Sequence, residues 1–347
     1  MQTDMTVGKP MKMLLNFTIP VFIGNVFQQL YSMADAVIVG KFVGTKGLAA
    51  VGATGTITFL IIGFCLGTCT GLAVPVAQKF GAKNYSEMRK FVMNAAYLAI
   101  FLAVIMTIVT CALCGSILTW MKTPDQFYQG AYDYLFVIFL GIPFTFLYNV
   151  VAGIIRSLGD SKTPFYFLAA SSLSNIAVDI WFVKSFNMGV AGVAWATFLC
   201  QGISCVLALV VVFRRFAKIP TEGRVRVFSW NHFGRFAIIA IPSILQQSFI
   251  SVGNIIIQSV INSFGAAVMA GYSAAVKLNN MVITSLTTLG NGISNYTAQN
   301  LGASKYDRIK SGFRAGIKLV WALCVPLVAL YVFAGQPLVH IFLDSPT

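Results

Sequence analysis

Long runs of apolar residues dominate the chain and are separated by short polar or charged breaks. A helix needs about 20 apolar residues to cross the hydrocarbon core of a bilayer. The runs are uniformly apolar rather than alternating, which is typical of transmembrane helices and not of barrel strands. They predict nine transmembrane helices, at 14–40, 48–76, 92–119, 132–155, 164–183, 188–213, 236–261, 267–298 and 315–341.

The composition agrees with this pattern and excludes other classes of protein. Hydrophobic residues make up 57% of the 347 residues and charged residues only 10%, whereas a soluble domain carries about 25% charged residues. A water-soluble globule, a disordered chain, a collagen and a coiled coil are therefore excluded. The sequence predicts an all-α polytopic membrane protein.

The basic residues indicate the orientation of the helices. The net charge is +14, an excess that in a soluble protein would suggest a nucleic-acid or acidic-lipid partner. Nineteen Lys and Arg residues fall at the N-terminus or in every second loop, and four fall on the other side. Cytoplasmic loops are enriched in Lys and Arg. We therefore expect a cytoplasmic N-terminus, and the charge gives no evidence for nucleic acid.

The chain contains an internal repeat. Residues 77–85 and 298–306 are identical at five of nine positions, and Ile19-Pro20 corresponds to Ile241-Pro242. Six predicted helices separate the copies, so both copies have the same orientation in the membrane. Repeats of this kind are typical of transporters that enclose a site between two halves. We name residues 1–221 the first lobe and residues 222–347 the second lobe.

The second lobe is shorter than the first. It contains three predicted helices against six, so the repeat predicts a C-terminally truncated protein whose last three helices are absent. The alternative is a natural nine-helix protein with a degenerate second half.

Three charged residues lie deep within the predicted helices, namely Asp35, Asp179 and Lys277. Ionisable residues at such depth are costly and are functional candidates. At 1.5 Å per residue, Asp35 and Asp179 lie roughly 8 Å inside the outer end and Thr197 roughly 12–15 Å inside it. Asn175 precedes Asp179 by one helical turn and shares its face. The spacing thus permits two carboxylates, an amide and a hydroxyl to meet in the first lobe.

Such a cluster suits a hard cation or a proton. Oxygen ligands match Na⁺, and two adjacent carboxylates disfavour a state in which both are ionised without a counter-charge. The alternative is a buried hydrogen-bonded network that only fixes the packing of the lobe.

Small residues suggest close packing elsewhere. Gly63, Gly67 and Gly71 recur every fourth residue and allow a neighbouring helix to approach closely. The seven cysteines fall inside predicted helices, and Cys111-x-x-Cys114 has no second ligand pair, so we interpret them as packing residues.

The chain resembles the multidrug and toxic compound extrusion (MATE) family of secondary transporters over essentially its whole length. The resemblance rests on Pro20, Asp35, the Ala-Gln-x-x-Gly-Ala motifs at 77–82 and 298–303, Arg156-Ser-Leu-Gly-Asp160, Asn175-x-x-x-Asp179 and Gly192-x-x-x-Ala196-Thr197. It implies two six-helix lobes in a V. It also implies exchange of Na⁺ or H⁺ for mostly cationic, amphipathic compounds.

The resemblance also implies roles for single residues. Asp35, Asn175, Asp179 and Thr197 match the cation-coupling site of the family, a possible Na⁺ site. Gln28 and Asn149 match polar positions of the substrate cavity, and Pro20 matches a conformational hinge, with a static kink as the alternative. Lys277 is either a cavity charge or a side chain that extends toward the membrane surface.

The function we expect is therefore efflux of organic cations or toxic compounds by antiport, not enzymatic catalysis. No ATP-binding G-x-x-x-x-G-K-[ST] motif occurs, and we expect no cofactor besides the coupling ion. The alternative is a flippase for a lipid-linked saccharide, although such a cavity calls for more basic residues than Lys277. A channel or membrane-embedded enzyme is a third reading. We expect a monomer in a bacterial plasma membrane, with a small-molecule substrate and the bilayer as its partners.

Overall fold

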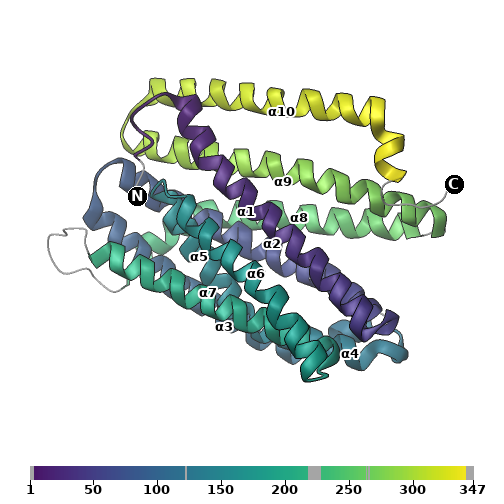
Figure 1. Cartoon of the computed structure of the whole chain (residues 1–347). Helices are drawn as coiled ribbons and strands as arrows, with labels where there is room; N and C mark the ends of the chain where they lie inside the picture. Colours follow the sequence, from purple (N-terminus) through teal and green to yellow (C-terminus); the bar gives the residue numbers. More distant parts are fainter. Residues whose placement is uncertain (1–3, 122, 218–227, 263, 265, 341–347) are drawn as a thin grey trace.

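The computed structural model describes residues 4–340 except residues 122, 218–227, 263 and 265 (Figure 1). The described part is built from helices: α1 (Pro10–Ile38), a π-helical turn η1 (Val39–Val43), α2 (Thr45–Gly81), α3 (Tyr85–Trp120), α4 (Asp125–Leu140), α5 (Ile142–Ser157), α6 (Lys162–Ser185), α7 (Gly189–Ala217), α8 (Trp230–Asn262), α9 (Ala266–Gly302) and α10 (Tyr306–His340).

The predicted helices match these elements, with one difference. The stretch 132–155 is not one straight helix, because α4 and α5 meet at Gly141 with a bend of 44°. Pro143 lacks a backbone N–H and cannot continue the hydrogen-bond ladder of α4, which accounts for the break. Within the described residues, seven helices are long and apolar enough to cross a membrane, and the bent pair makes an eighth. The fold is an all-α polytopic membrane fold.

The internal repeat is visible in the backbone. Lys83 and Ser304 occupy equivalent positions after the two repeated motifs, and both have positive φ, 55° and 57°. The backbone N–H of Ala82 donates to Gln78 O, and that of Ala303 donates to Gln299 O, each at 3.0 Å. The two copies therefore end their helices with the same turn.

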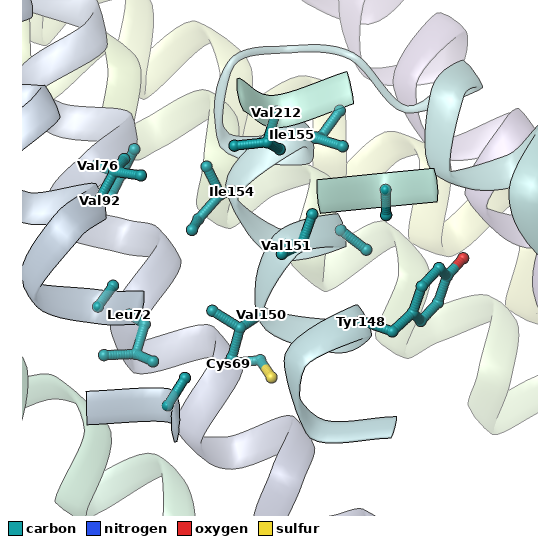
Figure 2. Packing of buried hydrophobic residues seen from close by; sticks show 14 of the residues in the cluster. Cys69, Leu72, Val76, Val92, Tyr148, Val150, Val151, Ile154, Ile155 and Val212 are labelled. Atoms are coloured by element: carbon teal, nitrogen blue, oxygen red, sulfur yellow. The ribbon is translucent and has the colours of Figure 1, made fainter. Parts of the chain in front are cut away.

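The core of the first lobe lies between α2, α3, α5 and α7. Figure 2 shows Leu72 and Val76 of α2 beside Val150 and Ile154 of α5. These side chains are at most 3% exposed, and burial of each contributes about 1.5–3 kcal/mol. The cluster fixes the positions of α2 and α5 close to the loops where the repeated motif ends.

One end of the bundle holds residues 4–9, which precede α1, together with the loops 82–84, 158–161 and 303–305; we name it the N-terminal end. In Figure 1 the helices of the first lobe and those of the second lobe, α8–α10, converge at this end and spread apart toward the other. The helix α1 runs between the two groups and contacts both α6 and α9.

The prediction of close packing at the spaced glycines is confirmed. A Cβ atom added to Gly63 would lie 3.2 Å from Ser251 Oγ, and one added to Gly67 would lie 2.9 Å from Ile244 Cα. A Cβ on Gly71 would overlap the backbone of Ala240. These glycines therefore form the seam between α2 of the first lobe and α8 of the second.

Candidate cation-coupling site

The candidate site lies inside the first lobe, where α1, α6 and α7 meet. Asp35 stands near the end of α1, Asn175 and Asp179 lie one turn apart on α6, and Thr197 belongs to α7. The helix α1 approaches α6 closely because Gly24 has no side chain: a Cβ there would lie 3.2 Å from Leu168 Cδ2. This close contact brings the carboxylate of Asp35 to α6.

Asn175 connects the three helices. In the amide orientation that satisfies its neighbours, its Nδ2 donates to Asp35 Oδ1 and to Asp179 Oδ2, each at 3.2 Å. Its Oδ1 accepts from the backbone N–H of Thr197 at 3.3 Å. Hydrogen bonds to a carboxylate contribute about 1.5–3 kcal/mol each, so the amide supports the two carboxylates at one level.

The two carboxyl groups differ in their exposure to solvent. Asp179 is 0% exposed and Asn175 is 3% exposed, while Asp35 is partly exposed. Asp35 and Asp179 lie near each other, because Asn175 Nδ2 donates to both. Asp179 Oδ1 is buried and has no hydrogen-bond partner in the described part of the chain. A buried acceptor without a partner is costly, so a proton or a small cation fits here.

The donor set is consistent with a hard cation. Asp35 and Asp179 offer carboxylate oxygens, which are the ligands of cations such as Na⁺ rather than of thiophilic metals, whereas the amide oxygen of Asn175 faces the N–H of Thr197. Among the described residues, no group of three or more His, Cys, Asp or Glu side chains is placed to hold a metal ion.

Two tyrosines lie near the carboxyl groups and were not predicted from the sequence. Tyr31 and Tyr134 are close enough to interact electrostatically with both Asp35 and Asp179. Tyr31 precedes Asp35 by one helical turn and so lies on the same face of α1. This spacing could have identified Tyr31 from the sequence. Tyr134 belongs to α4, and no sequence pattern links that helix to the site.

The other predicted residues have different positions. Thr197 contributes its backbone N–H, and its hydroxyl group makes no hydrogen bond to Asp35, Asn175 or Asp179 among the described residues. Gln28 is exposed on α1, two turns before Asp35. Asn149 Nδ2 donates to Thr145 O within its own helix at 2.8 Å. Lys277 belongs to α9, but its side chain lies outside the described part of the chain.

Pro20 and the carboxylate of Asp133 also lie in predicted helices. Pro20 lies inside α1, between the N-terminal end and the site. Asp133 also falls within a predicted helix, and its Oδ1 accepts from Gln129 Nε2 at 2.8 Å. It is therefore engaged on its own helix.

Comparison with known proteins supports the same reading. The MatE family model matches residues 20–181 and 242–347, which is more than half of the chain. The chain belongs to the MATE family. The match has two segments, one in each lobe, and the family consists of transporters rather than enzymes. The protein is therefore a multi-pass membrane transporter.

Individual MATE proteins extend this likeness. The probable multidrug resistance protein YpnP of Bacillus subtilis is 29% identical over 99% of this chain and 77% of its own length. A MOP superfamily transporter from Pyrococcus furiosus superimposes with a TM-score of 0.90 at 23% identity, over 99% of this chain and 76% of that one. An outward-facing multidrug resistance MATE transporter gives a TM-score of 0.89, also at 23% identity, over 99% of this chain and 76% of that one. YpnP supports a drug efflux transporter, and the two solved structures show the shared fold.

Proposed function

We propose that this MATE protein exports small organic cations by antiport with Na⁺ or H⁺, and that the coupling ion binds at Asp35, Asn175 and Asp179. The observation that carries the proposal is a partly exposed carboxyl group, Asp35, beside a buried one, Asp179, whose Oδ1 has no hydrogen-bond partner among the described residues. The names of two Bacillus subtilis relatives, both probable multidrug resistance proteins, support a drug as the substrate.

The orientation of the Asn175 amide has different consequences for binding of H⁺ and of Na⁺. With Nδ2 toward the carboxylates, the amide donates to both and its oxygen faces the N–H of Thr197. A proton shared by the carboxyl groups is compatible with this orientation. Binding of Na⁺ by the amide oxygen requires the amide to rotate and to give up the contact with Thr197.

Ion binding can drive transport only if the ion binds one conformation of the protein better than another. The site joins α1 to α6 and α7, while α1 also contacts α9 of the second lobe. A change in the position of α1 at Asp35 therefore reaches the contact between the lobes. We infer that the N-terminal end faces the cytoplasm, because the excess of Lys and Arg belongs to that end.

The proposal is tested with the protein reconstituted in liposomes that contain a fluorescent organic cation. We expect dye movement under an imposed Na⁺ or H⁺ gradient, and the gradient that drives it identifies the ion. Asp35→Asn and Asp179→Asn should each abolish gradient-driven movement, and Asn175→Leu should reduce it by about tenfold or more, because these changes remove site bonds.

Asp125→Asn is the matched control, because Asp125 is an exposed carboxylate at the start of α4. It should leave dye movement unchanged. Full gradient-driven efflux by Asp35→Asn would remove the coupling role of the cluster. If the wild-type protein moves no cationic dye under either gradient, the substrate assignment is wrong, and movement of a lipid-linked saccharide becomes the next assay.

A further inference from the structure

The two repeated Ala-Gln-x-x-Gly-Ala motifs lie against each other at the N-terminal end. A Cβ atom added to Gly81 would overlap the carbonyl group of Gln299, and one added to Gly302 would overlap the carbonyl group of Gln78. The contact is reciprocal: the glycine of each motif faces the glutamine carbonyl of the other. The spacing of glutamine and glycine in the motif thus has a physical cause, because only glycine permits this approach.

The contact between the lobes becomes less tight along α2 away from this end. A Cβ on Gly71 would overlap the backbone of α8, whereas a Cβ on Gly63 would lie 3.2 Å from a side-chain oxygen. A Cβ on Gly55 or Gly52 would meet nothing within 4 Å. The contact of Gly81 on α2 with Gly302 on α9 therefore continues the α2–α8 seam at its tightest, at the N-terminal end.

The side chain of Gln299 bonds two further segments to this contact. It is 0% exposed. Its Nε2 donates to the carbonyl oxygen of Ser157, at the end of α5, over 2.8 Å. Its Oε1 accepts from the backbone N–H of Met5 over 2.9 Å. One buried amide of the second lobe thus holds two parts of the first lobe.

Residues 5–8 form a segment of turns and bends before α1, which we name the N-terminal strap. It belongs to the first lobe in sequence, but second-lobe side chains hold it. Lys305 Nζ donates to Thr6 O at 2.9 Å, and Arg308 Nη2 donates to Gly8 O at 2.9 Å. The Met5 side chain is 1% exposed and packs in a cluster with Tyr296 of α9.

We propose that the reciprocal glycine contact, Gln299 and the N-terminal strap form a gate that closes the space between the lobes at the N-terminal end. Opening at that end requires the two motifs to separate and the Gln299 bonds to Ser157 and Met5 to break. In addition, either the strap must leave α9 and α10, or α1 must bend while the strap stays in place. Gln299 is then a positioning residue of the transport cycle. This inference rests on the proposed function, since a gate has a purpose only in a transporter.

Hydrogen–deuterium exchange on the protein in lipid nanodiscs tests the gate without any substrate. The variants are Gly81→Ala, Gly302→Ala and Gln299→Leu. We expect exchange of the peptide that contains the Met5 amide to become about tenfold faster or more in each, because its bond or its closed surroundings are lost. Neither glycine has a positive φ, and alanine favours a helix more than glycine does. Faster exchange in the alanine variants therefore cannot result from a lower helix propensity.

Matched controls lie on the same helices. Gly52→Ala on α2 and Gly290→Ala on α9 place a Cβ where nothing lies within 4 Å, and Asn295→Leu removes an amide that bonds only within α9 among the described residues. These three should leave exchange at Met5 unchanged. Equal acceleration in the controls, or none in the three gate variants, overturns the gate. If the glycine variants do not fold, Gln299→Leu, which adds no atom to the seam, still decides the result.

A second measurement separates a gate from static packing. In the wild-type protein we expect exchange of the strap and of peptides covering both motifs to change together by severalfold when Na⁺ is added or the pH is lowered. No response to either ion overturns gating even if the variants exchange faster. If dye transport is absent but the three segments respond together, the proposed function fails and the gate stands; if transport is present without the response, the gate alone fails.

Discussion

Asp160, in the loop between α5 and α6, illustrates how single polar residues hold the N-terminal end. Its Oδ1 accepts from the backbone N–H of Thr163 at 3.0 Å, and its Oδ2 pairs with Arg215 Nη2 of α7 at 2.6 Å. Burial alone would raise the pKa of Asp160, but the hydrogen bonds from Thr163 and the charge of Arg215 outweigh it and lower the pKa. The ionised carboxylate therefore stabilises the folded state.

The pH dependence of stability should reflect this residue. A lowered pKa in the folded state contributes stability that is complete above about pH 4, the ordinary range of Asp, and is lost as the pH falls through the lowered value. Asp160→Asn should cost about 1–3 kcal/mol at pH 7 and should flatten the loss of stability below about pH 4. Thermal unfolding of purified protein between pH 3 and pH 7 measures both effects. An equally steep acid loss in Asp160→Asn contradicts the assignment, and Asp125→Asn serves as control.

Residue spacing predicted some features of the site and could not predict others. Asp35, Asn175 and Asp179 were expected at one depth because helical rise is regular, and the structure brings them together. Thr197 was expected for its hydroxyl, but a backbone N–H makes the contact, and spacing cannot tell the two apart. Tyr134 comes from α4, whose position depends on tertiary packing that the pattern of one helix does not encode. Binding of an ion by this cluster stays a prediction.

At the scale of elements, the positions of the helices followed from hydrophobic length, because a bilayer core sets the length of each span. The bend at Gly141 did not follow, although Pro143 is a usable signal. Uniformly apolar helices mask such breaks, since hydropathy averages over them. The seam between α2 and α8 was anticipated only as close packing at three glycines; its partner helix required the structure.

The spaced glycines of α2 predict a graded effect of alanine. Gly71→Ala should destabilise the protein by ~1–3 kcal/mol, because the new methyl group meets the backbone of Ala240, which cannot move aside. Gly63→Ala should cost little, because the side chain of Ser251 can rotate away. Gly55→Ala should be neutral or slightly stabilising. Thermal unfolding of the three variants in one detergent provides the order, and an equal effect in all three contradicts the seam.

Pro20 predicts an effect on transport rather than on ion binding. It interrupts the hydrogen-bond ladder of α1 between the site at Asp35 and the contact of Thr18 with Gly292 of α9. Pro20→Ala restores the missing N–H and straightens or stiffens the helix. This change stabilises the helix locally by up to about 3 kcal/mol. We expect gradient-driven dye efflux to fall several-fold while binding of the coupling ion, measured by calorimetry, is retained. Unchanged efflux would show that the proline is only a static kink.

At the scale of the whole molecule, the two lobes differ in their role. The proposed ion site lies wholly within the first lobe, on α1, α6 and α7, whereas the proposed gate needs residues from both. The helix α1 connects the two, because Asp35 stands near one of its ends and the strap precedes the other. Its middle also bonds to the second lobe, since Asn25 Nδ2 donates to Thr288 Oγ1 at 2.9 Å. An ion that displaces α1 therefore acts on the seam through this helix.

The orientation of the whole molecule in the membrane is the final prediction. The N-terminal end carries most of the Lys and Arg residues, which favours the cytoplasmic side. Ser304 is exposed in the turn after α9 at that end, and Thr45 is exposed at the opposite end, where α2 begins. A membrane-impermeant maleimide should therefore label Ser304→Cys in inside-out vesicles and Thr45→Cys in right-side-out vesicles or intact cells. The wild-type protein controls for its seven cysteines, five of which are buried and two partly buried. Labelling of Ser304→Cys from the outside would reverse the orientation, and with it the proposed direction in which the gate at Gln299 opens.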